Sequence, residues 1–238
     1  MTKRLCFIGD SHLACIRKAW DETSADATFF ALPGRGMARI EVRDGTLSSG
    51  NPDVVRTLKL VSGGLERIDA AYDAYVLHAM HLGTAVALTL LRDMREVGAP
   101  AALVGRADFR AALRDGIESS IAVTTLRKLR AIARAPAVVS PTPLADTQFA
   151  ALRASLVERG AAAALARLFA EECEAVCASL DARFVPQPPE TLDADGLATR
   201  AEYARDAVRF ADGKPSQDSS HMNARYGARV VAAVTAAL

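Results

Sequence analysis

Near its start the chain reads Leu5-Cys6-Phe7-Ile8-Gly9-Asp10-Ser11-His12. The apolar residues of this run show no polar alternation, which is typical of a strand in a parallel sheet that helices cover on both faces. Beyond it, Leu13, Ile16 and Trp20 recur at helical spacing. The run therefore predicts a buried strand followed by a helix, and it puts the hydroxyl of Ser11 at the tip of the strand, where the helix starts.

The same alternation of strand and helix recurs along the rest of the chain. Strands are predicted over residues 4–9, 27–32, 72–78, 101–104, 137–140 and 182–185. Helices are predicted over residues 11–21, 54–60, 84–97, 107–134 and 223–237, and one long or broken helix over residues 147–180. Residues 37–52 and 186–220 are expected to be loop-rich. This rhythm predicts an α/β protein, a three-layer α/β/α sandwich whose mostly parallel central sheet has about five strands.

The length of 238 residues is enough for one large domain or two small ones. No convincing linker and no internal repeat divides the sequence. We therefore expect a single domain over residues 1–238. Residues 107–134 are a candidate helical insertion, because they lengthen one of the crossovers.

The composition is that of a globular protein, with 50% hydrophobic and 24% charged residues. The net charge is only +1, so neither a nucleic acid nor a membrane is expected as a partner. An aromatic content of 5% also weakens any interpretation based on base stacking. No signal peptide is visible at the start, which predicts a cytoplasmic protein.

The four cysteines are Cys6, Cys15, Cys173 and Cys177, and none belongs to a Cys-x-x-Cys pair. They are expected to be small buried hydrophobic residues. No metal-ligand spacing of histidines, cysteines or carboxylates stands out, and no Gly-rich phosphate loop of standard spacing occurs. The sequence therefore predicts neither a metal nor a cofactor.

Near its other end the chain reads Asp218-Ser219-Ser220-His221, with a carboxylate and an imidazole three residues apart. A serine is a poor nucleophile unless a base takes its proton and a third group orients that base. Taken alone, Asp10 or Ser11 is also an ordinary helix cap, and so is Asp218. Loops at the carboxyl edge of a parallel sheet meet, so we expect the two ends of the chain to come together there.

These segments resemble the SGNH (GDSL-type) hydrolase family. Phe7-Ile8-Gly9-Asp10-Ser11 is similar to the first sequence block of that family and Asp218-Ser219-Ser220-His221 to the last, and Val138-Val139-Ser140 running into Pro141-Thr142-Pro143 also follows its pattern. The specific motifs cover only the two ends. The resemblance implies a flavodoxin-like sheet, with Ser11 as nucleophile, His221 as base and Asp218 as the residue that orients His221.

The resemblance also implies an oxyanion hole. A backbone donor is expected from the loop after the second strand, where Gly34 or Gly36 is the candidate and a plain turn the alternative. The asparagine that the family has after the third strand is absent, because this region reads Val76-Leu77-His78-Ala79-Met80-His81. An imidazole can also donate a hydrogen bond, so His81 is the expected substitute, whereas His78 is expected to be buried in the strand.

The sequence thus predicts a serine esterase (an acyl hydrolase) or acyltransferase that forms an acyl-serine intermediate with an O-acyl ester of a small molecule or a carbohydrate. The missing asparagine keeps open a non-catalytic binding module on the same scaffold. A nucleotide-binding domain is less favoured, since Gly9 is the only glycine of its turn. His12 is expected at the surface, on a different side from Ser11. The substrate and the oligomeric state are not indicated.

Overall fold

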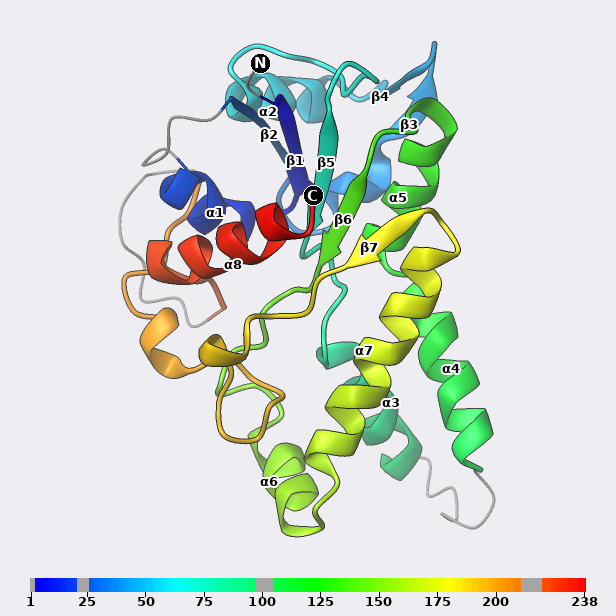
Figure 1. Ribbon diagram of the computed structural model, residues 1–238, viewed down its shortest axis with the longest axis vertical. Helices are drawn as coiled ribbons and strands as arrows, with labels where there is room; N and C mark the ends of the chain where they lie inside the picture. Colours follow the sequence, from blue (N-terminus) through cyan, green and yellow to red (C-terminus); the bar gives the residue numbers. More distant parts are fainter. Residues whose placement is uncertain (1–2, 21–25, 97–104, 211–219) are drawn as a thin grey trace.

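In the computed structural model the chain forms a five-stranded sheet between two layers of helices (Figure 1). The structure describes residues 3–20, 26–96, 105–210 and 220–238. The sheet order is β2-β1-β5-β6-β7, and all neighbouring strands are parallel. The strands are β1 (Leu5–Gly9), β2 (Ala27–Ala31), β5 (Ala74–His78), β6 (Ala137–Ser140) and β7 (Ala182–Phe184). The predicted α/β sandwich with about five parallel strands is confirmed.

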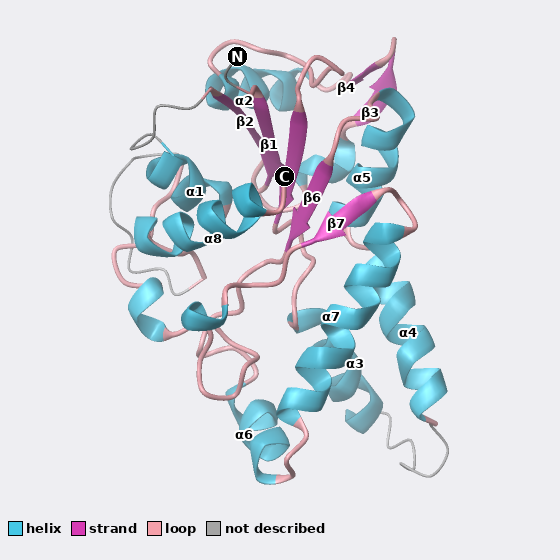
Figure 2. Ribbon diagram, viewed as in Figure 1, coloured by secondary structure: helices cyan, strands magenta, loops and turns pink. Residues whose placement is uncertain are grey.

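The helices lie on both faces of this sheet (Figure 2). One face is covered by α1 (Leu13–Trp20) and α8 (Ala224–Ala236). The other side carries α2 (Pro52–Ser62), α3 (Ala85–Glu96), α4 (Arg106–Glu118), α5 (Ile121–Ile132), α6 (Ala150–Glu158) and α7 (Ala162–Ala178). This is a doubly wound arrangement, and its strand order reverses between β1 and β5.

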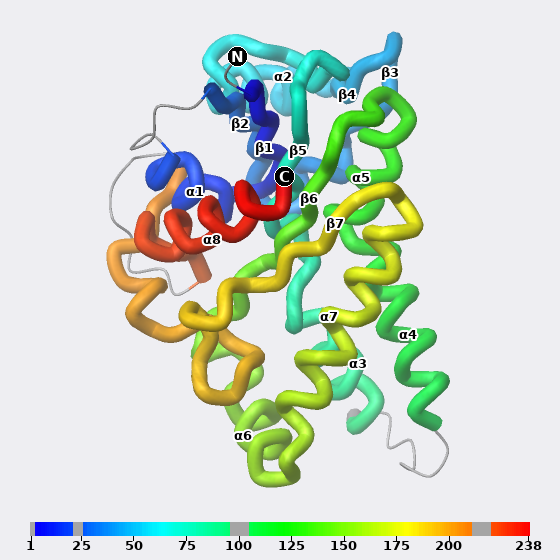
Figure 3. Tube along the Cα trace, viewed as in Figure 1, coloured from blue at the N-terminus to red at the C-terminus, as the bar shows by residue number. Residues whose placement is uncertain are grey.

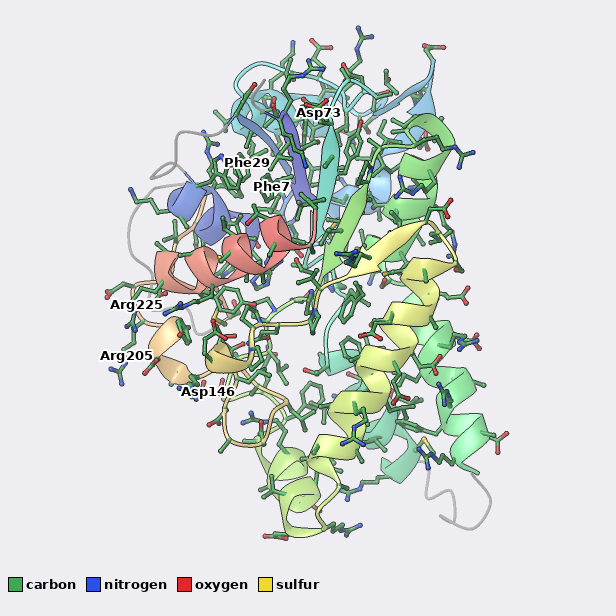
Figure 4. All side chains as sticks on the ribbon, viewed as in Figure 1. Phe7, Phe29, Asp73, Asp146, Arg205 and Arg225 are labelled. Atoms are coloured by element: carbon green, nitrogen blue, oxygen red, sulfur yellow. The ribbon has the colours of Figure 1, made fainter. Side chains whose placement is uncertain are left out.

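Two hydrophobic cores follow from the alternation of side chains along the strands. Phe7 of β1 packs under α1 and α8, whereas the next residue, Ile8, belongs to the core on the opposite face. Phe7 stacks on Phe29 of the neighbouring strand, with ring centroids 4.8 Å apart (Figure 4). Phe7 and Ile8 are both fully buried, so helices cover β1 on both faces of the sheet.

The carboxyl end of β1 needs a residue without a side chain. A Cβ atom on Gly9 would lie 2.7 Å from the backbone oxygen of His78 and 2.7 Å from Cγ of Leu13. Glycine therefore allows β5 and the start of α1 to approach the point where β1 ends. The candidate nucleophile Ser11 follows two residues later.

The first and last helices of the chain lie side by side, as the blue and red segments of Figure 3 show. A Cβ atom on Gly227 of α8 would lie only 2.0 Å from the backbone oxygen of Cys15 in α1. The two helices thus touch backbone to backbone, and only glycine permits this contact. The packing of α1 against α8 brings the two ends of the sequence to the same part of the molecule.

The prediction of a loop over residues 37–52 is wrong in part. A 3-10 turn, Gly36–Arg39, is followed by an antiparallel hairpin of β3 (Glu41–Arg43) and β4 (Thr46–Ser48). Its turn residues Asp44 and Gly45 have φ values of 49° and 70°. Asp-Gly is a strong hairpin signal, because both central residues of this turn need positive φ.

The predicted helix over residues 107–134 is divided in two, and the one over residues 147–180 takes the broken form of the two that were expected. Residues 107–134 form α4 and α5, and the Ser120 side chain caps α5 by accepting a hydrogen bond from the Val123 N–H. Residues 147–180 form α6 and α7, separated at Gly160 with a φ of 64°. The strand predicted over residues 101–104 lies outside the described residues. Among the described helices, none has both the length and the apolar character needed to cross a membrane.

Candidate active site

Ser11 lies in the turn between the end of β1 and the start of α1, and its neighbour Asp10 is buried. One carboxylate oxygen of Asp10 accepts the backbone N–H of His12 at 3.0 Å, and the other accepts the N–H of Met80 at 2.9 Å. Asp10 therefore does more than cap α1. It connects the turn that carries Ser11 to the turn that follows β5.

The structure brings Ser11 and His221 together. Nε2 of His221 lies 2.8 Å from Oγ of Ser11, within hydrogen-bond distance, and both side chains are half-buried. On the other side of the ring, Nδ1 lies 3.2 Å from Oγ of Ser220. Asp218, the third residue of the predicted triad, lies outside the described residues.

The segment after His221 is fixed by Asn223. Its side chain donates hydrogen bonds to the backbone oxygens of Glu202 and Arg205, both at 2.9 Å. The same side chain accepts the N–H of Tyr226 at 3.1 Å and so caps α8. The anchored start of α8 limits how far the preceding His221 can move.

His12 stacks on the imidazole of His221. The ring centroids are 5.0 Å apart and the ring planes differ by 22°. The expectation that His12 occupies the surface on a different side from Ser11 is therefore wrong: it faces the base that Ser11 contacts. No local sequence signal indicates this contact, because it depends on where the distant segment that carries His221 packs.

His78 is fully buried at the end of β5, as expected for a strand residue. Its Nδ1 lies 2.8 Å from Oγ of Ser140 on the adjacent strand. Burial, with a smaller contribution from the nearby His12, lowers the pKa of the His78 imidazole to about 3. His78 is consequently neutral over the ordinary pH range and is a structural residue of the sheet.

The turn after β5 holds three consecutive residues in the left-handed region. Ala79, Met80 and His81 have φ values of 65°, 53° and 62°. Each such residue costs roughly 1–2 kcal/mol when it is not glycine, so the surroundings must hold this turn in place. Asp10 does so at Met80, and the backbone oxygen of Ser140 accepts the N–H of Ala79 at 3.0 Å.

The three oxyanion candidates lie in different settings. The N–H of Gly36 is used by a turn, in which the Pro33 oxygen accepts it at 3.0 Å, and a Cβ at Gly36 would lie 2.6 Å from Cβ of Leu32. Gly34 has a φ of 54° and open space around it. His81 is exposed and lines a separate cleft of about 940 Å³. The oxyanion role of Gly34, Gly36 and His81 stays a prediction.

Ser11 and His221 line a cleft of about 550 Å³. Its other lining residues come from the end of β2 and the segment after it, from α1, from α2 and from the segment before α8: Ala31, Leu32, Pro33, Arg17, Thr57, Leu60, Val61, Arg209 and Phe210. Most of these side chains are apolar. The Ser11 hydroxyl therefore faces a cleft large enough for a small organic ligand.

The described residues contain no group of three or more histidine, cysteine or acidic side chains that could hold a metal ion. All four cysteines are buried and free, as expected. Burial raises the pKa of Cys15 and of Cys177 to about 12, so neither thiol ionises readily. The only nucleophile–base contact at the cleft, within the described part of the chain, is that of Ser11 with His221.

The sheet order, a serine directly after the first strand and a histidine just before the last helix form the arrangement that the sequence resemblance implied. The fold is the doubly wound, parallel α/β sandwich that the resemblance to the SGNH hydrolases implied. In this fold the loops after β1 and before α8 meet beyond the carboxyl ends of the parallel strands, where such sheets bind ligands.

No protein-family model matches the chain, and no curated protein matches its sequence. Solved structures with a similar overall arrangement include an extracellular lipase from Streptomyces rimosus, at 14% identity and a TM-score of 0.49 over 100% of both chains. The lipase Lip_vut3 from a goat rumen metagenome has 9% identity and a TM-score of 0.47, over 99% of this chain and 97% of its own. A carbohydrate acetylesterase family member from Sinorhizobium meliloti has 14% identity and a TM-score of 0.41, with the same coverage.

Proposed function

We propose that this protein is a serine esterase that cleaves O-acyl esters through an acyl-serine intermediate. The observation that carries this proposal is the 2.8 Å contact between Oγ of Ser11 and Nε2 of His221 beside an open cleft. An imidazole at this distance is placed to take the serine proton during attack on a carbonyl carbon. A buried serine–histidine pair such as Ser140 and His78 has no such access to substrate.

In the proposed reaction the Ser11 oxygen forms a bond to the ester carbonyl carbon while its proton passes to Nε2 of His221. The alcohol then leaves and takes that proton, which gives the acyl-serine. Water attacks the acyl group with His221 again acting as base, and the released acid leaves Ser11 protonated. An alcohol in place of water would make the same site an acyltransferase.

The reaction needs two further groups: an acceptor for the hydrogen on Nδ1 of His221, and donors to the oxyanion. Nε2 must be unprotonated to accept the serine proton, so Nδ1 carries the hydrogen and needs an acceptor. Oγ of Ser220 lies at hydrogen-bond distance from Nδ1, and Asp218 is proposed as the carboxylate that completes the triad. Backbone N–H groups of Ser11 and Gly34 are proposed as oxyanion donors.

A non-catalytic binding module is the second candidate. It is favoured by the absence of an asparagine in the turn Ala79–His81 and by the engagement of the Gly36 N–H with Pro33. A scaffold can retain its cleft while it loses turnover. The two candidates differ in whether Ser11 reacts with an electrophile.

The test is covalent labelling with a fluorophosphonate, which reports an activated serine without knowledge of the substrate. The esterase is expected to be labelled at Ser11, and Ser11→Ala is expected to abolish labelling. Ser119→Ala is the matched control, because Ser119 is exposed and lies far along the chain in the α4–α5 junction. Absence of labelling in the wild type, or labelling that persists in Ser11→Ala, would favour the binding module.

A further inference from the structure

The cleft beside Ser11 has walls from three separate segments. Leu60 and Val61 come from the end of α2, Leu32 from the segment after β2, and Phe210 from the segment before α8. These side chains surround a volume of about 550 Å³, which Ser11 and His221 also line. A group bound covalently to Ser11 would thus have apolar side chains on several sides.

Besides Ser11 and His221, three lining side chains are polar, Arg17, Thr57 and Arg209, and the first two bond to the protein backbone. The hydroxyl of Thr57 donates to the backbone oxygen of Asp53 at 2.9 Å. The guanidinium of Arg17 donates to the backbone oxygen of Val61 at 2.8 Å, and its carbon lies 6.0 Å from the ring centroid of Phe210. Arg17 therefore ties two walls of the cleft together and adds its own aliphatic stem to them.

Walls of this kind discriminate between chemical groups. A sugar ring would lose hydrogen bonds to water on entering and find few replacements, because only three of the nine lining residues besides Ser11 and His221 are polar and two of these three already bond to the backbone. An alkyl chain loses nothing of this kind, and each methylene that leaves water strengthens binding. The cleft consequently suits the acyl part of an ester and not a carbohydrate alcohol.

Leu60 supports the same assignment. It is 80% exposed at the end of α2, whereas Leu58 of the same helix is fully buried against the sheet. A single exposed leucine is ordinary on a protein surface. This one, however, lines the cleft that holds Ser11, so its apolar surface is available to a bound chain.

We propose that this cleft binds the acyl chain of the substrate and makes the enzyme prefer esters of medium-length apolar acids over acetyl esters. The proposal rests on the proposed esterase function and deepens it by naming the class of acyl group. Leu60, Val61 and Phe210 are the side chains that set the preference.

The first measurement is kcat/KM for p-nitrophenyl acetate, butyrate and octanoate, which share one leaving group and differ only in the acyl chain. Burial of a methylene is worth roughly fourfold in kcat/KM, so octanoate is expected to exceed acetate by at least a hundredfold if most of its chain enters the cleft. Ser11→Ala gives the background rate for each ester.

The second measurement compares two leucine substitutions of the same kind. Leu60→Asp puts a carboxylate at the cleft, and it is expected to lower the octanoate-to-acetate ratio at least tenfold. Leu65→Asp is the matched control, because Leu65 is 45% exposed and is not among the cleft-lining residues. It is expected to leave the ratio at its wild-type value.

The outcomes separate the two proposals. Ser11-dependent hydrolysis with no gain from acetate to octanoate, or an unchanged ratio in Leu60→Asp, overturns the acyl-chain cleft and leaves the esterase in place. No Ser11-dependent hydrolysis and no fluorophosphonate labelling overturn both. A rising series that Leu60→Asp flattens and Leu65→Asp does not supports the assignment.

Discussion

Nε2 of His221 lies 2.8 Å from Oγ of Ser11, although 210 residues separate the two in the chain. Local sequence cannot produce such a contact. It depends on the turn after β1, which holds Ser11, and on the packing of α8 against α1, which brings His221 beside that turn (Figure 1). We therefore expect that a substitution that shifts α8 relative to α1 also moves His221 relative to Ser11.

Gly227→Ala tests this coupling. In an ordinary helix interior, alanine is more stable than glycine by about 1 kcal/mol. Here the new Cβ would lie 2.0 Å from the backbone oxygen of Cys15, so α8 must shift. We expect the free energy of unfolding to fall by about 2 kcal/mol and the labelling rate of Ser11 to fall with it.

Urea unfolding measures the free energy of unfolding, and labelling kinetics measure the rate at Ser11. Ala228→Ser is the control, since Ala228 is the exposed neighbour of Gly227 in the same helix. An increase in stability for Gly227→Ala would show that the two helices are not in backbone contact.

The stack of His12 on His221 predicts a positioning role for His12. His12→Ala removes the ring 5.0 Å away and leaves the base free to turn, so we expect the labelling rate to fall roughly tenfold. His12→Phe keeps a flat ring of similar size and is expected to retain most of the rate. If alanine and phenylalanine lower the rate equally, stacking is not what holds His221.

Asp10→Asn tests the link between the two turns. Both carboxylate oxygens of Asp10 accept backbone N–H groups, from His12 and Met80, and an amide can offer only one oxygen. The other N–H then faces an NH₂ group, so the free energy of unfolding is expected to fall by about 1–3 kcal/mol. Thermal unfolding is the measurement, with the exposed Asp44→Asn as control. Equal melting temperatures for the two variants would rule out a structural role for the Asp10 carboxylate.

His78 predicts a pH dependence of stability. Its pKa in the folded protein is lowered to about 3 from an ordinary value of 6.5. Between these values the unfolded state binds more protons than the folded state, so stability rises with pH and is lost as the pH falls below 6.5. From pH 7.5 to pH 5 the contribution of His78 falls by about 2 kcal/mol.

His78→Gln cannot titrate, so its free energy of unfolding is expected to fall by about 2 kcal/mol less than that of the wild type over the same interval. Urea unfolding of both proteins at the two pH values gives the difference. Parallel pH profiles would mean that His78 is not the buried neutral group described here.

Much of the fold could be predicted because short-range patterns in the sequence determine where its strands, turns and helices lie. The unbroken apolar run before Ser11 is typical of a central parallel strand, and parallel strands bring their following loops to one edge. The hairpin over residues 41–48 also had a local signal in Asp44-Gly45, which the interpretation of that region as loop missed. The junction at Ser120 likewise has the serine that a helix start favours.

The site was less predictable, because its details depend on how distant segments pack. Nothing in the sequence near His12 indicates that its ring stacks on His221. Nothing near Asp10 indicates that its carboxylate accepts the N–H of Met80. Gly227 was a usable signal, since an isolated glycine in a helical pattern often marks a close approach.

The rate of fluorophosphonate labelling at Ser11, in the wild type and in His221→Gln, tests the central claim most directly. If His221 is the base that takes the Ser11 proton, His221→Gln is expected to be slower by roughly a thousandfold or more, because the glutamine side chain cannot accept that proton. Equal labelling rates for the two proteins would contradict the assignment of His221 as the base that activates Ser11.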